Sequence, residues 1–172
     1  FKITPQPKTA PKLFLGGMAP PAIDRAARIA DGFLCTGGIG MDTYVECLAA
    51  NGKSPEEGNI ILGCWAIIAE DPEAEAAIVG DHVLYQSNEY IRWGAFGPPD
   101  QTPLFPDSRT AIENGLYELW DADMAVEKLS GMIEQYPQIS DIHFWAQFPG
   151  ESIETGNRRM AYIAEKVLPR LR

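Results

Sequence analysis

The sequence predicts an α/β protein with a parallel sheet, built like half of a (β/α)8 barrel. Four short apolar runs are each followed by a segment with helical periodicity. The runs are apolar on both faces and no hairpin signal joins them, which favours parallel strands connected by right-handed helical crossovers. Eight such units close a TIM barrel of about 250 residues, so four units in 172 residues indicate half of one. A small doubly wound sheet is the alternative.

The first two strand–helix units are predicted at residues 13–50. Residues 13–15 form a buried strand that Gly16-Gly17 ends. Pro20-Pro21 then open a helix, because proline is tolerated where its missing N–H loses no bond. Residues 33–36 form the second strand, and residues 41–50 its helix.

The third and fourth units are predicted from residue 60 onward. The apolar run 60–69 is the clearest strand, and Asp71, followed by proline and acid, begins a helix that extends towards Trp93. Another helix begins after Asp121. The remaining predictions are a long Gly- and Pro-rich loop over 94–110, a strand over 142–148 and a final amphipathic helix over 152–171.

The chain as a whole, residues 1–172, is predicted to be a single partial-barrel domain. Residues 1–12 open at Phe1 and carry three prolines, which indicates an extended lead-in within a chain cut from a longer protein.

Composition excludes several classes of partner. Lys and Arg number 14 against 24 Asp and Glu, giving a net charge of −10, so nucleic acid and anionic membrane surfaces are not expected partners. The three separated cysteines, Cys35, Cys47 and Cys64, are interpreted as buried reduced thiols. With no apolar run near the roughly 20 residues of a membrane span and no signal peptide, a cytoplasmic location is expected.

Several segments resemble the luciferase-like flavin-dependent monooxygenase superfamily. Residues 11–17 followed by 25–33 are similar to its apolar strand, Gly-Gly, Arg-Ala-Ala-Arg and Ala-Asp-Gly-aromatic signature. Residues 81–90, 142–150 and 167–169 resemble its later part, in the same order. The resemblance implies the C-terminal half of a luciferase-like (β/α)8 TIM barrel.

The family's barrels bind FMN, or in some branches F420, with the phosphate at the C-terminal rim. Many members react reduced flavin with oxygen and oxidise an organic substrate. The resemblance therefore implies a fragment of a flavin-dependent oxidoreductase or monooxygenase, inactive alone and with an unknown substrate, whether or not it still binds FMN or F420. The alternative is a non-catalytic flavin-binding or structural remnant, similar to truncated non-fluorescent flavoproteins. Because half a barrel leaves open strand edges, a homodimer or a missing N-terminal half is the expected partner.

The candidate cofactor site lies after the first two strands. Gly16, Gly17, Met18 and Ala19 lead from a strand into a helix, where glycines allow close approach and helix amides attract an anion. A tight turn without a ligand is the alternative, and the two prolines remove donors. Thr36 and Gly37 end the neighbouring strand and line either the flavin or an ordinary turn.

No catalytic residue and no metal site can be assigned from the sequence. His82 is interpreted as a surface or capping residue and His143 as a core histidine, and two separate histidines cannot supply three metal ligands. Trp93, Phe96, Trp120 and Trp145 either stack on a flavin or pack in the core or at an interface.

Overall fold

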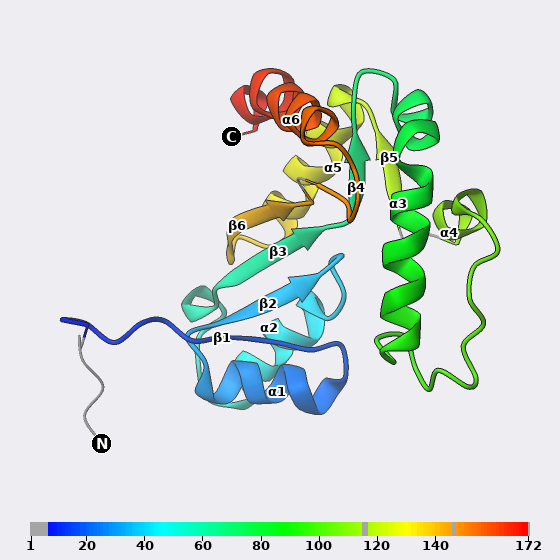
Figure 1. Ribbon diagram of the computed structural model, residues 1–172. Helices are drawn as coiled ribbons and strands as arrows, with labels where there is room; N and C mark the ends of the chain where they lie inside the picture. The colour runs from blue at the N-terminus through cyan, green and yellow to red at the C-terminus, as the bar shows by residue number, and fades with distance from the viewer. Residues whose placement is uncertain (1–6, 115–116, 146, 172) are drawn as a thin grey trace. The chain divides into compact units, whose positions relative to one another are not determined.

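The computed structural model describes residues 7–114, 117–145 and 147–171 of the chain (Figure 1). The chain divides into two compact units. The first runs to Cys64 and takes in Tyr136–His143; the second comprises Trp65–Gln135 and the residues from Phe144 onward.

The first unit contains a four-stranded sheet with the order β1-β2-β3-β6. Strand β1 pairs with β2, and β2 with β3, in parallel, so that Leu15 lies opposite Phe33 and Cys35 opposite Leu62. The elements are β1 (Phe14–Gly16), α1 (Pro20–Ile29), β2 (Gly32–Thr36), α2 (Met41–Ala50), a 3-10 turn (Pro55–Glu57), β3 (Ile60–Cys64) and β6 (Ile139–Phe144).

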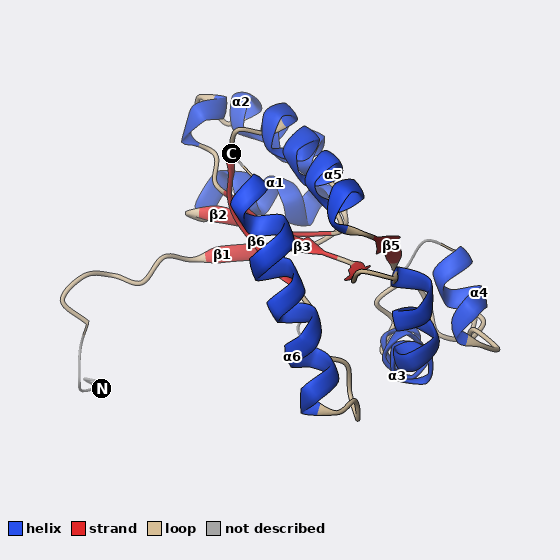
Figure 2. Cartoon of the chain, turned by 90° about the horizontal axis from the view of Figure 1, so that it is seen from above, coloured by secondary structure: helices blue, strands red, loops and turns tan. Residues whose placement is uncertain are grey.

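Helices α1 and α2 cover one face of this sheet (Figure 2). Phe33 and Cys35 of β2 are buried, and the ring of Phe33 stacks on that of Tyr44 with centroids 5.2 Å apart. Leu34, which points to the opposite face, is 41% exposed. Strand residues alternate between faces, so the second face, the one that would line a closed barrel, is open at β2.

The second unit pairs a short two-stranded parallel sheet with four helices. Its core contains Ile67, Val79, Val83, Tyr117 and Phe148. The elements are β4 (Ala66–Ile68), α3 (Pro72–Arg92), α4 (Ser108–Glu113), β5 (Glu118–Trp120), α5 (Ala122–Gln135) and α6 (Ile153–Tyr162), continued by a π-helical segment (Ile163–Val167) and a 3-10 turn (Leu168–Arg170).

The helix starts predicted from Asp71 and Asp121 are confirmed. The Asp71 carboxylate accepts a hydrogen bond from the Ala74 amide at 3.0 Å, and that of Asp121 from the Met124 amide at 2.8 Å. Both are N-cap bonds that satisfy an amide without a partner inside the helix. The helix predicted to begin at Pro20-Pro21 and the helix predicted over 41–50 are confirmed as α1 and α2.

The prediction of one strand over 60–69 is wrong. The run divides at Trp65 into β3 and β4, which belong to different sheets. Periodicity cannot detect this break, because both halves are apolar. The strand predicted over 142–148 begins earlier, at Ile139, and ends at Phe144. Strand β5 and helix α4 were not predicted, since each is short; α4 occupies the end of the predicted 94–110 loop.

Within the part of the chain that the structure describes, no helix is long and apolar enough to span a membrane.

Candidate functional site

The predicted cofactor residues lie at one edge of the four-stranded sheet. Gly16 ends β1 and Thr36 ends β2, and these strands are parallel neighbours, so their carboxyl ends share that edge. Gly16 and Gly37 are exposed, Gly17 and Thr36 are half-buried, and Met18 and Ala19, which lead into α1, are exposed. The topology thus places both predicted segments where open α/β sheets bind their ligands.

The first turn of α1 offers few donors to an anion. Ala19 is the N-cap and makes no side-chain capping bond. Pro20 and Pro21 have no amide hydrogen, and the Ala22 amide already donates to the Ala19 carbonyl at 2.9 Å. Gly17 also has a packing role, because a Cβ at this position would lie 2.6 Å from the Ala22 methyl. A phosphate here would depend on the amides that precede the prolines.

The loop after β2 is better suited to close approach by a ligand. Gly37 adopts φ +58°, which favours glycine, and a Cβ at Gly37 would meet no atom within 4 Å. The Gly37 amide donates to the Gly63 carbonyl at 2.7 Å, which fixes the start of the loop against β3. Gly40, at φ +83°, differs, because a Cβ there would lie 2.4 Å from Cδ1 of Ile23. Gly37 therefore borders open space, whereas Gly40 allows α1 and α2 to pack.

The buried thiol of Cys35 is not an activated nucleophile. None of Cys35, Cys47 and Cys64 forms a disulfide; Cys35 and Cys64 are buried and Cys47 is partly exposed. Burial raises the pKa of Cys35 to about 11, against the opposing effect of a backbone hydrogen bond from Gly38. The thiol is therefore protonated at neutral pH and acts as core packing.

The second unit contains an aromatic cluster that the sequence indicates only in part. Trp93, Phe96 and Trp145 belong to it, but Trp120 does not: Trp120 is buried, and its indole N–H donates to Glu118 at 3.0 Å. The members that sequence reasoning missed include Trp65, whose place at the end of β3 was hidden inside the apolar run. The aromatic cluster consists of Trp65, Tyr90, Trp93, Phe96, Tyr117, Trp145 and Phe148.

Trp65 is at the centre of this cluster. Its ring stacks on Tyr117 with centroids 5.2 Å apart, and it meets Phe96 and Trp145 edge-on, each at 6.2 Å. Tyr90 lies 5.9 Å from Trp65 and contacts Trp93 edge-on at 5.7 Å. Offset and edge-to-face arrangements of this kind are the favourable ones for aromatic rings.

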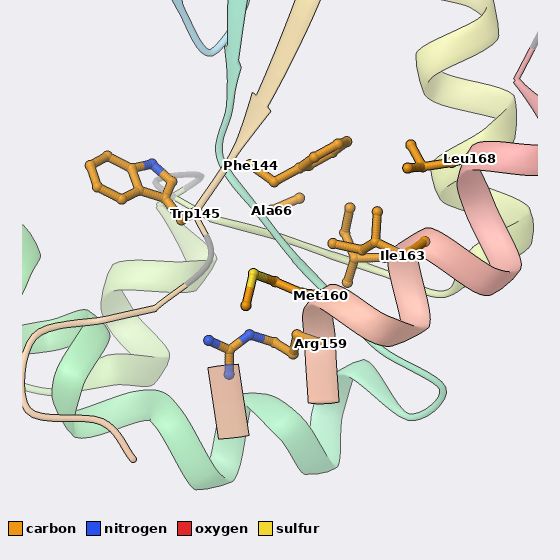
Figure 3. Close-up of a pocket in the computed structure, with 9 residues that line it drawn as sticks. Ala66, Phe144, Trp145, Arg159, Met160, Ile163 and Leu168 are labelled. Carbon is orange, nitrogen blue, oxygen red and sulfur yellow. The ribbon is translucent and has the colours of Figure 1, made fainter. Parts of the chain in front are cut away.

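A pocket of about 220 Å³ lies between β4, α6 and the residues that end β6 (Figure 3). Its one charged lining side chain, Arg159, is already engaged: the guanidinium donates to Glu151 at 2.7 Å and to Glu75 at 2.9 Å. The pocket therefore offers apolar contacts. Its lining residues are Ala66, Ile68, Phe144, Trp145, Arg159, Met160, Ile163, Ala164 and Leu168.

The two histidines have different surroundings. His143, predicted to be a core residue, is exposed; that prediction is wrong because β6 is the outer strand of its sheet. His82 is half-buried in α3. Among the described residues, no three or more His, Cys, Asp or Glu side chains are grouped so as to hold a metal ion.

Comparison with known proteins identifies related sequences and structures. Residues 1–128 match the family described as luciferase-like monooxygenase. No curated protein sequence gives a match.

Solved structures with this fold include an enzyme in complex with FMN, an F420-dependent reductase and a further monooxygenase, none of them above 18% identity. The oxygenating constituent of 3,6-diketocamphane monooxygenase from Pseudomonas putida, in complex with FMN, shares 14% identity with a TM-score of 0.57, over 95% of this chain and 50% of its own. The F420-dependent tetrahydromethanopterin reductase from Methanopyrus kandleri shares 18% identity with a TM-score of 0.56, over 94% of this chain and 51% of its own. A monooxygenase from Streptomyces bottropensis shares 18% identity with a TM-score of 0.61, over 92% of this chain and 48% of its own. The chain thus spans about half the length of these structures.

Proposed function

Because this chain belongs to the luciferase-like monooxygenase family, we propose that it is the C-terminal half of a flavin- or F420-dependent oxidoreductase. The observation that carries the proposal is the family match over residues 1–128, on a partial barrel whose adjacent parallel strands end at Gly16 and Thr36. The partial length agrees with it, since the chain covers about half of each solved structure.

In this proposal the sheet edge formed by Gly16, Gly17, Met18, Ala19, Thr36 and Gly37 contributes to binding the flavin cofactor, FMN or F420. The open space beside Gly37 supports it, because a backbone without a side chain lets a bulky ligand approach closely. When bound, the cofactor supplies the hydride or oxygen chemistry. The residues of this edge would position the cofactor, and the first turn of α1, which has few donors, would contribute less than the Gly37 loop.

We also propose that this chain does not turn over a substrate by itself. One face of β2 is open and β1 is an outer strand, so a barrel interior is incomplete without further strands. A second copy or the other half of the barrel would complete it. Flavin binding without turnover is therefore the behaviour expected of the isolated chain.

The test is a titration with FMN, and in parallel with F420, followed by quenching of cofactor fluorescence. The informative variant is Gly37→Ala, matched by Gly52→Ala. Both glycines have left-handed φ, +58° and +75°, and a Cβ at either would meet nothing within 4 Å. Each substitution should cost a similar roughly 1 kcal/mol of stability, but only Gly37 lies at the proposed site.

We expect saturable binding that Gly37→Ala weakens at least severalfold and Gly52→Ala leaves unchanged. Equal affinities for the two variants would remove Gly37 from the site. Failure of both cofactors to bind the wild-type chain would mean that the chain alone does not form a cofactor site.

A further inference from the structure

One end of the aromatic cluster is buried, and the other end is exposed to solvent. Tyr117 and Phe148 are 1% and 2% exposed and belong to the core of the second unit. At the other end Trp93 is 72% exposed and Phe96 37%. Leaving so much aromatic surface in water forgoes hydrophobic stabilisation, and contiguous patches of this kind on soluble proteins commonly mark binding sites.

The cluster begins at the carboxyl ends of two strands that are neighbours in the sheet. Trp65 directly follows Cys64, the last residue of β3, and Trp145 directly follows Phe144, the last residue of β6. In (β/α)8 barrels, active sites are built from residues at and just beyond the carboxyl ends of strands. A location of this kind agrees better with binding than with a purely structural surface.

Hydrogen bonds order the backbone around the exposed rings. The Asn88 side chain clamps the loop after α3 at both polar atoms of Phe105: its amide nitrogen donates to the Phe105 carbonyl at 3.0 Å, and its oxygen accepts from the Phe105 amide at 2.9 Å. The Ala95 amide donates to the Tyr90 carbonyl at 3.0 Å, which fixes the backbone beside Phe96. A surface that is already ordered binds a ligand without an added ordering cost.

The charges near the surface balance each other. Arg92, next to Trp93, forms an ion pair with Glu89 one turn earlier. The chain as a whole carries a net charge of −10, which disfavours anionic ligands. The rings themselves are therefore the main recognition element, and a planar aromatic ligand can adopt the stacked or edge-on geometries that they already use among themselves.

We propose that Trp93 and Phe96, supported by Tyr90 and Trp65, bind a planar aromatic group of an organic molecule. Taking that molecule as the substrate of the enzyme rests on the proposed function. The binding of an aromatic group itself does not.

Two probes and two matched variants test this inference by isothermal titration calorimetry at neutral pH. The probes are 2-naphthol and its saturated analogue decahydro-2-naphthol, which is similar in shape and polarity but has no π face. Trp93→Leu keeps an apolar side chain and removes the ring. Tyr85→Leu is the control, because Tyr85 is another exposed aromatic residue, 57% exposed, which lies in α3 outside the aromatic cluster.

We expect 2-naphthol to bind about tenfold more tightly than the saturated analogue. Trp93→Leu should weaken 2-naphthol binding fivefold to tenfold, whereas Tyr85→Leu should not change it. Thermal unfolding of both variants should match the wild type, because both side chains are exposed. Equal affinity for the two probes, or equal loss in the two variants, would overturn the inference.

The FMN titration separates this inference from the proposed function. Trp93→Leu should leave FMN affinity unchanged if the aromatic surface serves a substrate and the sheet edge serves the cofactor. If the wild-type chain binds 2-naphthol through Trp93 but no cofactor, the proposed cofactor site of the isolated chain fails while the aromatic site stands. If FMN binds and 2-naphthol does not, the aromatic site is refuted and the cofactor site is unaffected.

Discussion

At the scale of single residues, Arg159 is a buried side chain that makes several interactions at once. Its side chain is 4% exposed, and it pairs with two carboxylates that are equally buried, Glu75 and Glu151. Glu151 also accepts the Phe148 amide at 2.7 Å, and the guanidinium lies 5.2 Å from the centroid of the Phe148 ring. Arg159 therefore joins α6 to α3 and to the loop that precedes α6.

Replacing this arginine should be costly. Arg159→Met leaves the buried Glu151 without its cation, and Glu75 with only the more exposed Arg158; breaking a buried pair in this way destabilises comparable sites by about 3–5 kcal/mol. Arg158→Met is the matched control: Arg158 contacts the same Glu75 at 2.8 Å, but its side chain is 56% exposed, so the loss should be below about 1 kcal/mol. Urea unfolding measures both. Similar midpoints for the two variants would show that the buried network does not stabilise the fold.

At the scale of elements, the segment that returns to the first unit is fastened to its neighbours by side chains. The Tyr136 hydroxyl donates to the Asp42 carboxylate of α2 at 2.7 Å, and Gln138 donates to the Pro55 carbonyl at 3.2 Å. The hydrogen bond to Asp42, together with burial, raises the pKa of Tyr136 to about 12. The protonated phenol is the form that the fold stabilises.

The stabilisation by the hydrogen bond between Tyr136 and Asp42 should be lost at alkaline pH. Because the folded pKa lies above the unfolded value near 10, the stabilisation is complete below pH 10 and is lost as pH rises through about 12. The stability difference between wild type and Tyr136→Phe should therefore be constant from pH 7 to 9 and shrink above pH 10. Urea unfolding across that range provides the measurement. A difference that stays constant up to pH 12 would contradict the assigned hydrogen bond.

Some of the helices and strands could be predicted from the sequence alone, and others could not. Helices with caps and strands ended by glycines were predicted within a few residues, because these signals are local. The division of residues 60–69 at Trp65 was not predictable, since it depends on which strand each half pairs with. The same applies to the site: Gly16 and Thr36 follow from strand ends, whereas the contacts of Trp65 with Tyr90 and Tyr117 depend on tertiary packing.

At the scale of the whole molecule, the open face of the first sheet predicts self-association. We expect the wild-type chain to sediment as a dimer at micromolar concentration. Leu34→Glu, which places a charge on the open face, should shift it to monomer, while Ile29→Glu should not. Ile29 is more exposed, at 57% against 41% for Leu34, but it belongs to helix α1 and not to the sheet. A wild-type monomer would refute a homodimer.

The discontinuity of the first unit has a consequence for the order of folding. Strands β1, β2 and β3 follow one another along the chain, but β6 joins them only after all of Trp65–Gln135. Contacts between distant residues carry a larger loop-closure cost and form more slowly than local ones. The sheet should therefore assemble as a three-stranded intermediate in which β3 is briefly an unprotected edge. During synthesis the edge of β3 stays unpaired until the ribosome has made residues 65–135 and β6 after them. In that interval the edge is exposed to pairing with strands of other chains.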